Sequence, residues 1–297
     1  MEQPLVTIVV VSYNHSKYIR ENLDSIKNQT YGNIQLIVGD DASSDHSADV
    51  FEQWLKENNY SAEKKFHTHN TGLATMLNEC ILLAKGKYIK CIAADDFLHH
   101  DSIQECVLKL ESLGEEYGMV FTNTYAIDDN SNIMADIADY DKFGGVSREA
   151  FRKDILMGNK IAALTVLMKK EALIKTGIYE SDFLIEDYYR WLKINALYYT
   201  AYIPRKLAYY RLHDSNISSA RKERIDEECI YVQMLFDKNG DLKKIINYKI
   251  EKLYKTNKLS DFLLNQFKDY PYKSKRLHLA IKYSINPQLY AFISKFI

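Results

Sequence analysis

Three short apolar runs in the first hundred residues each end in a group of polar side chains. Continuous apolar runs of this length are typical of strands that are buried on both faces of a parallel sheet. The runs and the polar groups that follow them are Val6–Val11 with Ser12–His15, Leu36–Gly39 with Asp40–Asp41, and Tyr88–Ala94 with Asp95–Asp96. The sequence therefore predicts three strands with polar C-terminal ends.

Stretches with helical spacing of apolar residues separate these strands. Ile19, Leu23 and Ile26 share one face of a helix expected over about residues 16–28, and another helix is expected to begin near Glu186. A short strand is expected at Phe66–His69. Strands that alternate with helices indicate a Rossmann-like α/β fold, a mostly parallel sheet flanked by helices. The C-terminal ends of parallel strands share one edge, where such sheets bind ligands.

The pattern changes after residue 215. Residues 1–215 carry 23 Lys and Arg against 31 Asp and Glu, whereas residues 216–297 carry 16 against 9 and show only helical periodicity. The chain is therefore expected to divide into an α/β domain at 1–215 and a basic helical extension at 216–297. The basic face fits either ordinary solvation or contact with an anionic membrane. A terminal apolar stripe fits membrane contact or a homodimer; it consists of Leu289, Phe292, Ile293 and Phe296.

The composition is that of an ordinary globular protein. Of 297 residues, 46% are apolar and 27% are charged, and the net charge is −1. The four cysteines lack the spacing of a metal site, and we find no N-terminal leader and no run of about 20 apolar residues. These features predict a reducing, cytoplasmic location. The acidic first domain has no nucleic-acid-binding motif, which argues against nucleic acid as a partner.

Asp95 and Asp96 are the most informative of the polar strand ends. Two adjacent carboxylates repel each other unless a positive group lies nearby. A divalent cation that holds a diphosphate is the natural candidate, because such ions bind carboxylates together with substrate phosphates. The pattern alone leaves a second interpretation open, in which the pair is a polar strand end that caps the next helix.

Seven segments together resemble a family 2 glycosyltransferase with the GT-A fold. They follow the order and spacing of that family over about residues 4–215. Each is weak alone, but the ordered set is specific. The segments are Val11-Ser12-Tyr13-Asn14, Asn28-Gln29-Thr30-Tyr31, Val38 to Asp45, Asn70 to Ala74, Gly86 to Ile89, Ala94-Asp95-Asp96 and Glu186-Asp187. The resemblance implies that residues 1–215 form a GT-A domain that binds a nucleotide sugar and carries the catalytic site.

The resemblance assigns several of these residues to the nucleotide sugar. Tyr13 matches the position that stacks on the base, and Asp41 matches the acid that contacts uracil or an equivalent base. The alternative interpretations are a core aromatic for Tyr13 and a cap of the next helix for Asp41, but the place of Tyr13 at a strand end favours a ligand role. The residues implied in donor binding are Val11, Tyr13, Asp40, Asp41, Asn70, Gly72, Asp95 and His213.

The resemblance also implies a metal ion. Asp95 matches the last acid of the family's DxD motif, which holds Mn²⁺ or Mg²⁺. The first acid of that motif is replaced by Ala93, so Asp96 is a second candidate ligand. His213 matches a late segment that can close over the diphosphate, and its alternative is an ordinary surface histidine.

Asp187 matches the general base of the family. Its carboxylate can accept the proton of an acceptor hydroxyl if burial and the neighbouring Glu186 raise its pKa towards neutrality. One base opposite one leaving group predicts direct displacement with inversion at the anomeric carbon. From the pattern alone, Asp187 is equally a first-turn acid that the helix dipole favours.

These residues predict an inverting, metal-dependent glycosyltransferase. The expected donor is a nucleotide diphosphate sugar, with a UDP-sugar favoured, that supplies a hexose or N-acetylhexosamine. The resemblance to bacterial members of the family implies an acceptor that is a glycan or lipid-diphosphate-linked hydroxyl in surface polysaccharide synthesis, at the inner face of the cell membrane. Two alternatives are a catalytically silent nucleotide-sugar-binding scaffold and a sugar-phosphate nucleotidyltransferase. The latter needs a glycine-rich phosphate loop after the first strand, and Val11–His15 contains no glycine.

Overall fold

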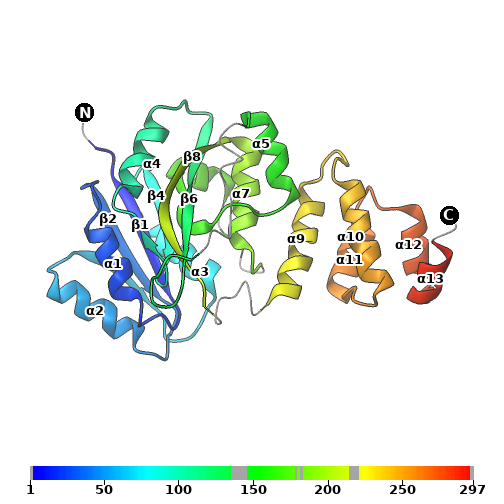
Figure 1. The fold of residues 1–297 in the computed structure, drawn as a ribbon, viewed down its shortest axis with the longest axis horizontal. Coiled ribbons are helices and arrows are strands. Elements are labelled where there is room, and N and C mark those ends of the chain that lie inside the picture. The colour runs from blue at the N-terminus through cyan, green and yellow to red at the C-terminus, as the bar shows by residue number, and fades with distance from the viewer. Residues whose placement is uncertain (1–2, 135–145, 178, 181–182, 214–220, 295–297) are drawn as a thin grey trace. The chain divides into compact units, whose positions relative to one another are not determined.

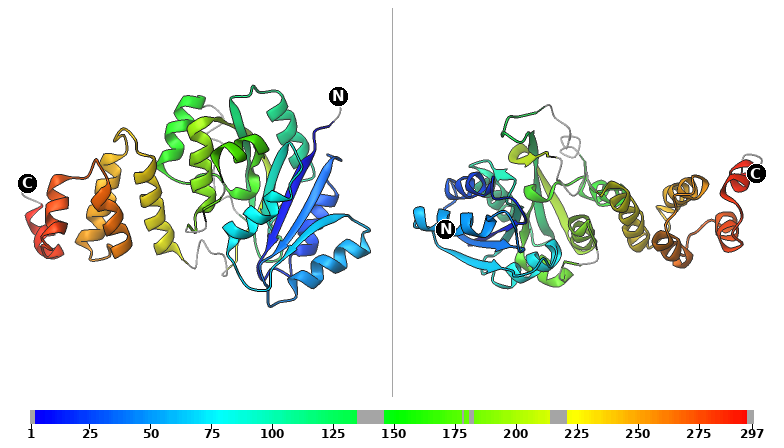
Figure 2. Two further views of the ribbon diagram at one scale, coloured as in Figure 1. Left: turned by 180° about the vertical axis from the view of Figure 1, so that it is seen from behind. Right: turned by 90° about the horizontal axis from the view of Figure 1, so that it is seen from below.

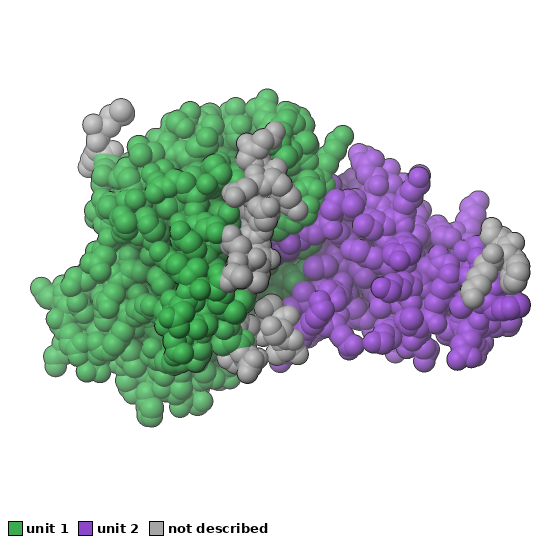
Figure 3. Space-filling model, in the orientation of Figure 1, with its two compact units in different colours: residues 1–155, 160–216 green, residues 156–159, 217–297 purple. Residues whose placement is uncertain are grey.

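The computed structural model divides the chain into two compact units. One unit comprises residues 1–155 and 160–216, and the other comprises residues 156–159 and 217–297 (Figure 3). The residues that the structure describes are 3–134, 146–177, 179–180, 183–213 and 221–294. The assignment of catalysis to residues 1–215 stays a prediction.

Within the described residues, the first unit is built on one eight-stranded sheet (Figure 1). Its strands are β1 (Val6–Ser12), β2 (Ile34–Asp40), β3 (Ala62–Phe66), β4 (Tyr88–Ala93), β5 (Phe97–Leu98), β6 (Tyr117–Ile127), β7 (Leu167–Lys169) and β8 (Tyr199–Arg211). Their order in the sheet is β3-β2-β1-β4-β7-β6-β8-β5. The first four strands in this order run parallel, and β6 is parallel to β8. β7 is antiparallel to β4 and β6, and β5 is antiparallel to β8.

Helices cover both faces of this sheet (Figure 1 and Figure 2). The described helices of this unit are α1 (Ile19–Lys27), α2 (Ser47–Glu57), α3 (Leu73–Leu82), α4 (Ser102–Glu111), α5 (Arg148–Asp154), α6 (Lys170–Thr176) and α7 (Glu186–Leu197). Short 3-10 helices lie at Ile155–Met157 and Ala163–Thr165.

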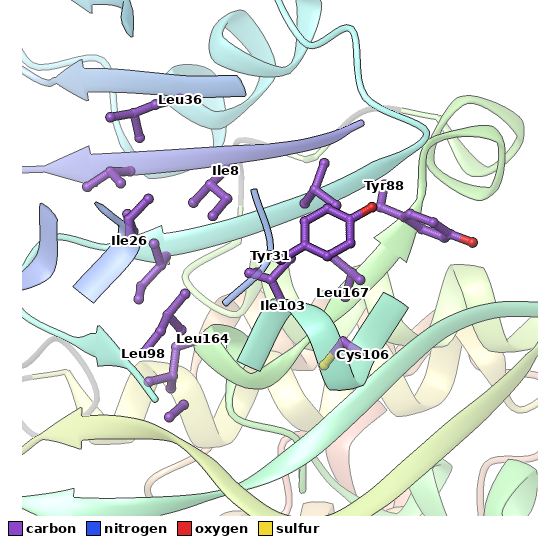
Figure 4. Close-up of a cluster of buried hydrophobic side chains, with 14 of the residues drawn as sticks. Ile8, Ile26, Tyr31, Leu36, Tyr88, Leu98, Ile103, Cys106, Leu164 and Leu167 are labelled. Atoms are coloured by element: carbon purple, nitrogen blue, oxygen red, sulfur yellow. The ribbon is translucent and has the colours of Figure 1, made fainter. Parts of the chain in front are cut away.

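The packing of β1 and β2 explains their apolar sequences. Every residue of β1 is buried, as expected for a strand that is covered on both faces. Ile8 and Leu36 pack in one cluster with apolar residues of α1, α2 and α4 (Figure 4). On the other face α3 approaches Gly39 so closely that an added Cβ would lie 2.7 Å from Met76 Sδ. Glycine is therefore required at this strand position for close helix packing.

Two expected elements have different limits in the structure. The strand expected at Phe66–His69 lies at Ala62–Phe66, because its partner β2 ends at Asp40, opposite Phe66. Helix α1 begins at Ile19 rather than at Ser16, because the Ser16 N–H donates to Asp45 Oδ2 at 2.8 Å. Residues 16–18 thus form a turn before the helix.

The second unit is helical, as the sequence predicts. Its described helices are α9 (Lys222–Phe236), α10 (Lys243–Lys255), α11 (Asp261–Asp269), α12 (Lys275–Lys282) and α13 (Pro287–Ile293). Its own apolar core includes Ile246, Ile250, Leu263, Phe267 and Leu277. In the described ranges, no helix has the length and apolar character that crossing a membrane requires.

Candidate active site

The C-terminal ends of β1, β2 and β4 lie side by side at one edge of the sheet. In the parallel register Ser12 lies opposite Asp40, and Val11 lies opposite Ala93. The loops that follow the three strands therefore begin at the same level. These loops carry Tyr13, Asp41 and Asp95, so the structure places three predicted site residues at one edge.

Hydrogen bonds hold the β1–α1 loop against the β2–α2 loop. Asn14 has a φ of 61° and accepts the Ser44 N–H at its side-chain Oδ1. The Asn14 N–H donates to Ser43 Oγ, and the His15 N–H donates to Ser47 Oγ. The polar motif after β2 therefore positions the backbone of the loop after β1.

The acids Asp40 and Asp41 are both buried and shape the loops around them. Asp40 accepts the N–H and the hydroxyl of Ser43, which closes the turn after β2. Asp41 accepts the N–H groups of Thr71 and Gly72 at 2.8 Å each. Asp41 thus anchors the loop that leads into α3 rather than capping α2, and its contact with a nucleobase stays a prediction.

His67 and Glu79 extend the group around Asp41. His67 Nδ1 lies 2.8 Å from Asp41 Oδ1, and His67 Nε2 lies 3.2 Å from Glu79 Oε2 on α3. Burial raises the pKa of Asp41, but hydrogen bonds from Thr71, His67 and Gly72 outweigh burial and lower it below its ordinary value. Asp41 is therefore an ionised anchor for this loop.

The other residues predicted to bind the donor differ in exposure. Tyr13 is 50% exposed, so it is not the core aromatic of the alternative interpretation. Asn70 is exposed, and Gly72 has a φ of 87°, a conformation that favours glycine. Val11 is buried in the sheet, and its carbonyl accepts the Ala94 N–H.

His15, Asp95 and His213 converge from the ends of three strands. His213 Nε2 lies 3.1 Å from Asp95 Oδ2, and His15 Nε2 lies 3.6 Å from the same oxygen. Suitable ligand atoms of the three residues all lie within 4.8 Å of one another. The side chain of His213 is only 9% exposed, so it is not the surface histidine of the alternative interpretation.

The adjacent acids Asp95 and Asp96 have opposite pKa shifts. Burial raises the pKa of Asp95, but His213 and His15 outweigh burial and lower it. Burial and the charge of Asp95 raise the pKa of Asp96 well above its ordinary value, although the Arg211 N–H donates to Asp96 Oδ1 at 2.9 Å. The opposite shifts follow from the repulsion within the pair, because the charge of Asp95 disfavours ionisation of Asp96. Asp96 lies outside the histidine cluster, so the geometry favours Asp95 as the metal ligand.

The cluster has the chemistry of a divalent-cation site. Asp95 Oδ1 is buried and has no hydrogen-bond partner among the described residues, and such an unpaired oxygen is costly unless a ligand satisfies it. Burial lowers the pKa of His15, with His213 adding to the effect and Asp95 opposing it. The neutral imidazole is the form that binds metals.

Arg211 is a buried residue that supports this cluster. Its Nε donates to the Asp95 carbonyl at 2.8 Å, and its terminal nitrogen pairs with the carboxylate of Glu21. The guanidinium lies 4.4 Å from the centroid of the Tyr18 ring, and that ring stacks on His213. Arg211 and Tyr18 therefore restrict the positions of Asp95 and His213.

Glu186 and Asp187 begin helix α7. Glu186 is buried and Asp187 is partly exposed. The buried Tyr179 lies within electrostatic reach of both acids and of Cys91 on β4, and the Arg190 guanidinium lies 4.4 Å from its ring centroid. Tyr179 is thus a buried residue within electrostatic reach of both the start of α7 and β4. The role of Asp187 as a base stays a prediction.

Comparison with known proteins decides the family. A family model described as Glycosyl transferase family 2 matches residues 7–175. The chain belongs to glycosyl transferase family 2. This family 2 chain is 26% identical to the putative teichuronic acid biosynthesis glycosyltransferase TuaG of Bacillus subtilis over 73% of the chain and 82% of TuaG. It is 37% identical to the putative glycosyltransferase EpsH of the same organism over 46% of the chain, a match that spans 39% of EpsH.

Solved structures share the fold of this family 2 chain. Staphylococcus aureus TarS 1–349 in complex with UDP-GlcNAc matches with a TM-score of 0.67 at 14% identity, over 96% of this chain and 88% of that chain. The mannosyltransferase PcManGT from Pyrobaculum calidifontis, in complex with GDP-Man and Mn²⁺, matches with a TM-score of 0.63 at 18% identity. The match covers 100% of this chain and 80% of that chain. The predicted GT-A fold is therefore confirmed.

Sequence reasoning missed three residues of this site, namely His15, His67 and Arg211. A signal existed for His15, because a histidine directly after a predicted strand end is a common type of metal ligand. His67 and Arg211 offer no comparable signal. Their contacts with Asp41 and Asp96 span 26 and 115 residues of sequence, and only the folded sheet brings them together.

Proposed function

We propose that this family 2 chain is an inverting, metal-dependent glycosyltransferase. It transfers a hexose or N-acetylhexosamine from a nucleotide diphosphate sugar to a hydroxyl of a glycan or lipid-linked acceptor. The observation that carries the proposal is the cluster of His15, Asp95 and His213 at the ligand-binding edge of a family 2 sheet.

The cluster supports a divalent metal. Asp95 and His213 would hold the ion, and Arg211 keeps both in place through the Asp95 carbonyl and the Tyr18 ring. When bound, such an ion neutralises the charge that develops on the leaving diphosphate. The Mn²⁺ in the PcManGT structure supports this assignment.

Asp187 is the proposed general base. Its carboxylate takes the proton of the acceptor hydroxyl while that oxygen forms a bond to the anomeric carbon. The bond between the anomeric carbon and the diphosphate oxygen breaks in the same step, and the nucleoside diphosphate leaves with the electron pair. Attack from the side opposite the leaving group inverts the anomeric configuration. The partial exposure of Asp187 beside the buried Glu186 supports this role, because an acceptor can reach it.

A UDP-sugar is the favoured donor. The half-exposed ring of Tyr13 offers an aromatic surface on which a nucleobase can stack. Asp41 orders the neighbouring loop through the N–H groups of Thr71 and Gly72. The related folds of TarS with UDP-GlcNAc and of PcManGT with GDP-Man support a nucleotide-sugar donor.

A donor screen tests the proposed reaction. Sugar transfer is measured with UDP-, GDP- and dTDP-sugars in the presence of Mn²⁺. We expect transfer from a UDP-sugar, and we expect chelation of the metal to stop it. Asp95→Asn should lower turnover about 10²-fold or more, because charge stabilisation at the leaving group is lost. Asp49→Asn, at an exposed position on α2, is the matched control and should keep full turnover.

The same assay separates the two alternative functions. Binding of a nucleotide sugar without turnover of any donor would favour a silent scaffold. Release of diphosphate from a nucleoside triphosphate and a sugar phosphate would favour a nucleotidyltransferase. Either result contradicts the proposed transfer reaction.

We also propose that the second unit contacts an anionic membrane surface, where a lipid-linked acceptor would reside. The chain has no acidic residue after Asp269. Apolar side chains beside cationic ones favour binding to anionic lipid. The exposed residues that share a helix face are Lys275, Leu279 and Lys282 on α12 with Tyr283 at its C-cap, and Leu289, Phe292 and Ile293 on α13. The name of TuaG, which refers to teichuronic acid biosynthesis, supports a surface polysaccharide as the product.

Removal of the three exposed apolar side chains of α13 is expected to weaken membrane binding about tenfold or more, because less apolar surface is then buried in the lipid. The variant replaces Leu289, Phe292 and Ile293 with Ser, and the measurement is sedimentation with phosphatidylglycerol vesicles. Leu82→Ser and Leu108→Ser change exposed apolar residues of the first unit and are the controls. Unchanged sedimentation of the α13 variant would contradict membrane contact, and a change in oligomeric state instead would indicate a homodimer interface.

A further inference from the structure

His15 lies in the β1–α1 loop with its ring close to Asp95 and His213. Its Nε2 is 3.6 Å from Asp95 Oδ2, and the centroids of the His15 and His213 rings are 6.2 Å apart in an edge-on arrangement. Nitrogen and oxygen ligands bind one divalent cation at about 2.0–2.2 Å, so neighbouring ligand atoms lie roughly 3 Å apart or more. The separations of 3.1 Å and 3.6 Å from Asp95 Oδ2 suit ligands that share one ion.

We propose that His15 is a third protein ligand of the metal, and that the resulting set of two imidazoles and one carboxylate makes the site prefer Mn²⁺ to Mg²⁺. The inference rests on the proposed glycosyltransferase function, to which it adds a ligand and a metal preference.

The backbone around His15 is held independently of any metal. The His15 N–H donates to Ser47 Oγ at 3.1 Å, and the His15 carbonyl accepts the Tyr18 N–H at 2.9 Å. Tyr18 also stacks on His213, so one residue contacts both parts of the chain that supply the imidazoles. The two rings are therefore pre-positioned beside Asp95, which reduces the cost of ordering them when the ion binds.

The polar atoms of His15 have few partners within the described residues. Its Nε2 lies 3.6 Å from Asp95 Oδ2, whereas Nδ1, which an ion at Nε2 does not reach, is buried without a hydrogen bond. Buried imidazole nitrogens are normally satisfied by protein or solvent. The Nε2 atoms of both histidines thus approach the same carboxylate oxygen, which places two nitrogens and one oxygen around one point.

The residue at position 93 fits this inference, because an alanine supplies no side-chain oxygen to the ion. A second carboxylate there would give an all-oxygen ligand pair, which suits Mg²⁺ as well as Mn²⁺. With Ala93 in the sequence, the carboxylate of Asp95 is joined by nitrogen ligands instead. Imidazole suits transition-metal ions, whereas Mg²⁺ favours oxygen ligands and retains its waters.

Metal titrations of the whole chain test this inference. Mn²⁺ binding is followed by the loss of the free-ion electron paramagnetic resonance signal, and Mg²⁺ is added as competitor, both with and without UDP. The chain should bind Mn²⁺ at least about tenfold more tightly than Mg²⁺, and His15→Gln should weaken Mn²⁺ binding about tenfold or more while changing Mg²⁺ binding little. His15→Asp restores a ligand oxygen and should shift the preference towards Mg²⁺. His278→Gln, on α12 of the second unit, is the matched control and should change neither.

Pulsed electron paramagnetic resonance of bound Mn²⁺ provides the decisive measurement. Two directly coordinated ¹⁴N nuclei are expected in the unaltered chain and one in His15→Gln, a result that a purely structural role of His15 would not produce. One nitrogen in the unaltered chain, or unchanged Mn²⁺ affinity in a folded His15→Gln variant, would overturn the inference even if sugar transfer is observed. Two nitrogens in a chain without transferase activity would support the ligand assignment and contradict the proposed function, so the two failures are distinguishable.

Discussion

Replacing Asp187 with Asn is expected to lower the rate of sugar transfer about 10²–10⁴-fold, the usual contribution of a positioned general base. Asparagine has nearly the same shape as aspartate but does not accept a proton. Because Asp187 lies in the first turn of α7, its loss should leave the donor-nucleotide edge of the sheet unchanged. The measurement is kcat for transfer, together with the Kd for UDP, which should stay within about twofold of the unaltered value.

Glu171→Gln is the matched control for this prediction. Glu171 is an exposed acid in the first turn of α6, so it has the same favourable interaction with a helix N-terminus. If Asp187 serves only the helix dipole, both variants should lose about 0.3–1 kcal/mol of stability and keep their activity. Full turnover in Asp187→Asn would therefore exclude the base assignment, whereas loss of turnover in that variant alone would support it.

Replacing Arg211 with Met is expected to lower the free energy of unfolding by about 3 kcal/mol, the low end of the range for breaking a buried ion pair. The guanidinium is only 1% exposed and bonds to the Asp95 carbonyl and the Glu21 carboxylate. Removal leaves the Asp95 carbonyl without this donor and takes the cation from the face of the Tyr18 ring. We expect the low end of this range because the Glu21 side chain is 39% exposed. Water can therefore solvate its carboxylate when the guanidinium is removed.

Arg205→Met is the control on the same strand. Arg205 pairs with Glu105 at the surface, with side-chain exposures of 47% and 36%, and such pairs contribute about 0–1 kcal/mol. Urea unfolding of both variants measures the difference. Equal losses of stability would contradict the central role of Arg211, and weaker Mn²⁺ binding in folded Arg211→Met would show that it also positions Asp95 and His213.

Local patterns predicted the edge of the sheet and the placement of Asp41 and Asp95 on it. An apolar run followed by polar residues indicates a strand and its end without knowledge of distant contacts, and the register of β1 with β2 and β4 confirms that these ends adjoin. The same pattern did not indicate how Lys90 is accommodated. Lys90 lies within the run of β4 and is fully buried, and burial lowers its pKa to about 8.

By itself, the sequence determined which strands end in polar groups and which family the ordered motifs resemble. Only the tertiary structure decided which polar groups face one another. Asp95 and Asp96 are neighbours in sequence, yet Asp95 meets His213, 118 residues away, while Asp96 meets the backbone of Arg211. These contacts depend on the strand order β4-β7-β6-β8-β5. That order follows from pairing between distant segments, which the spacing of residues along one strand does not specify.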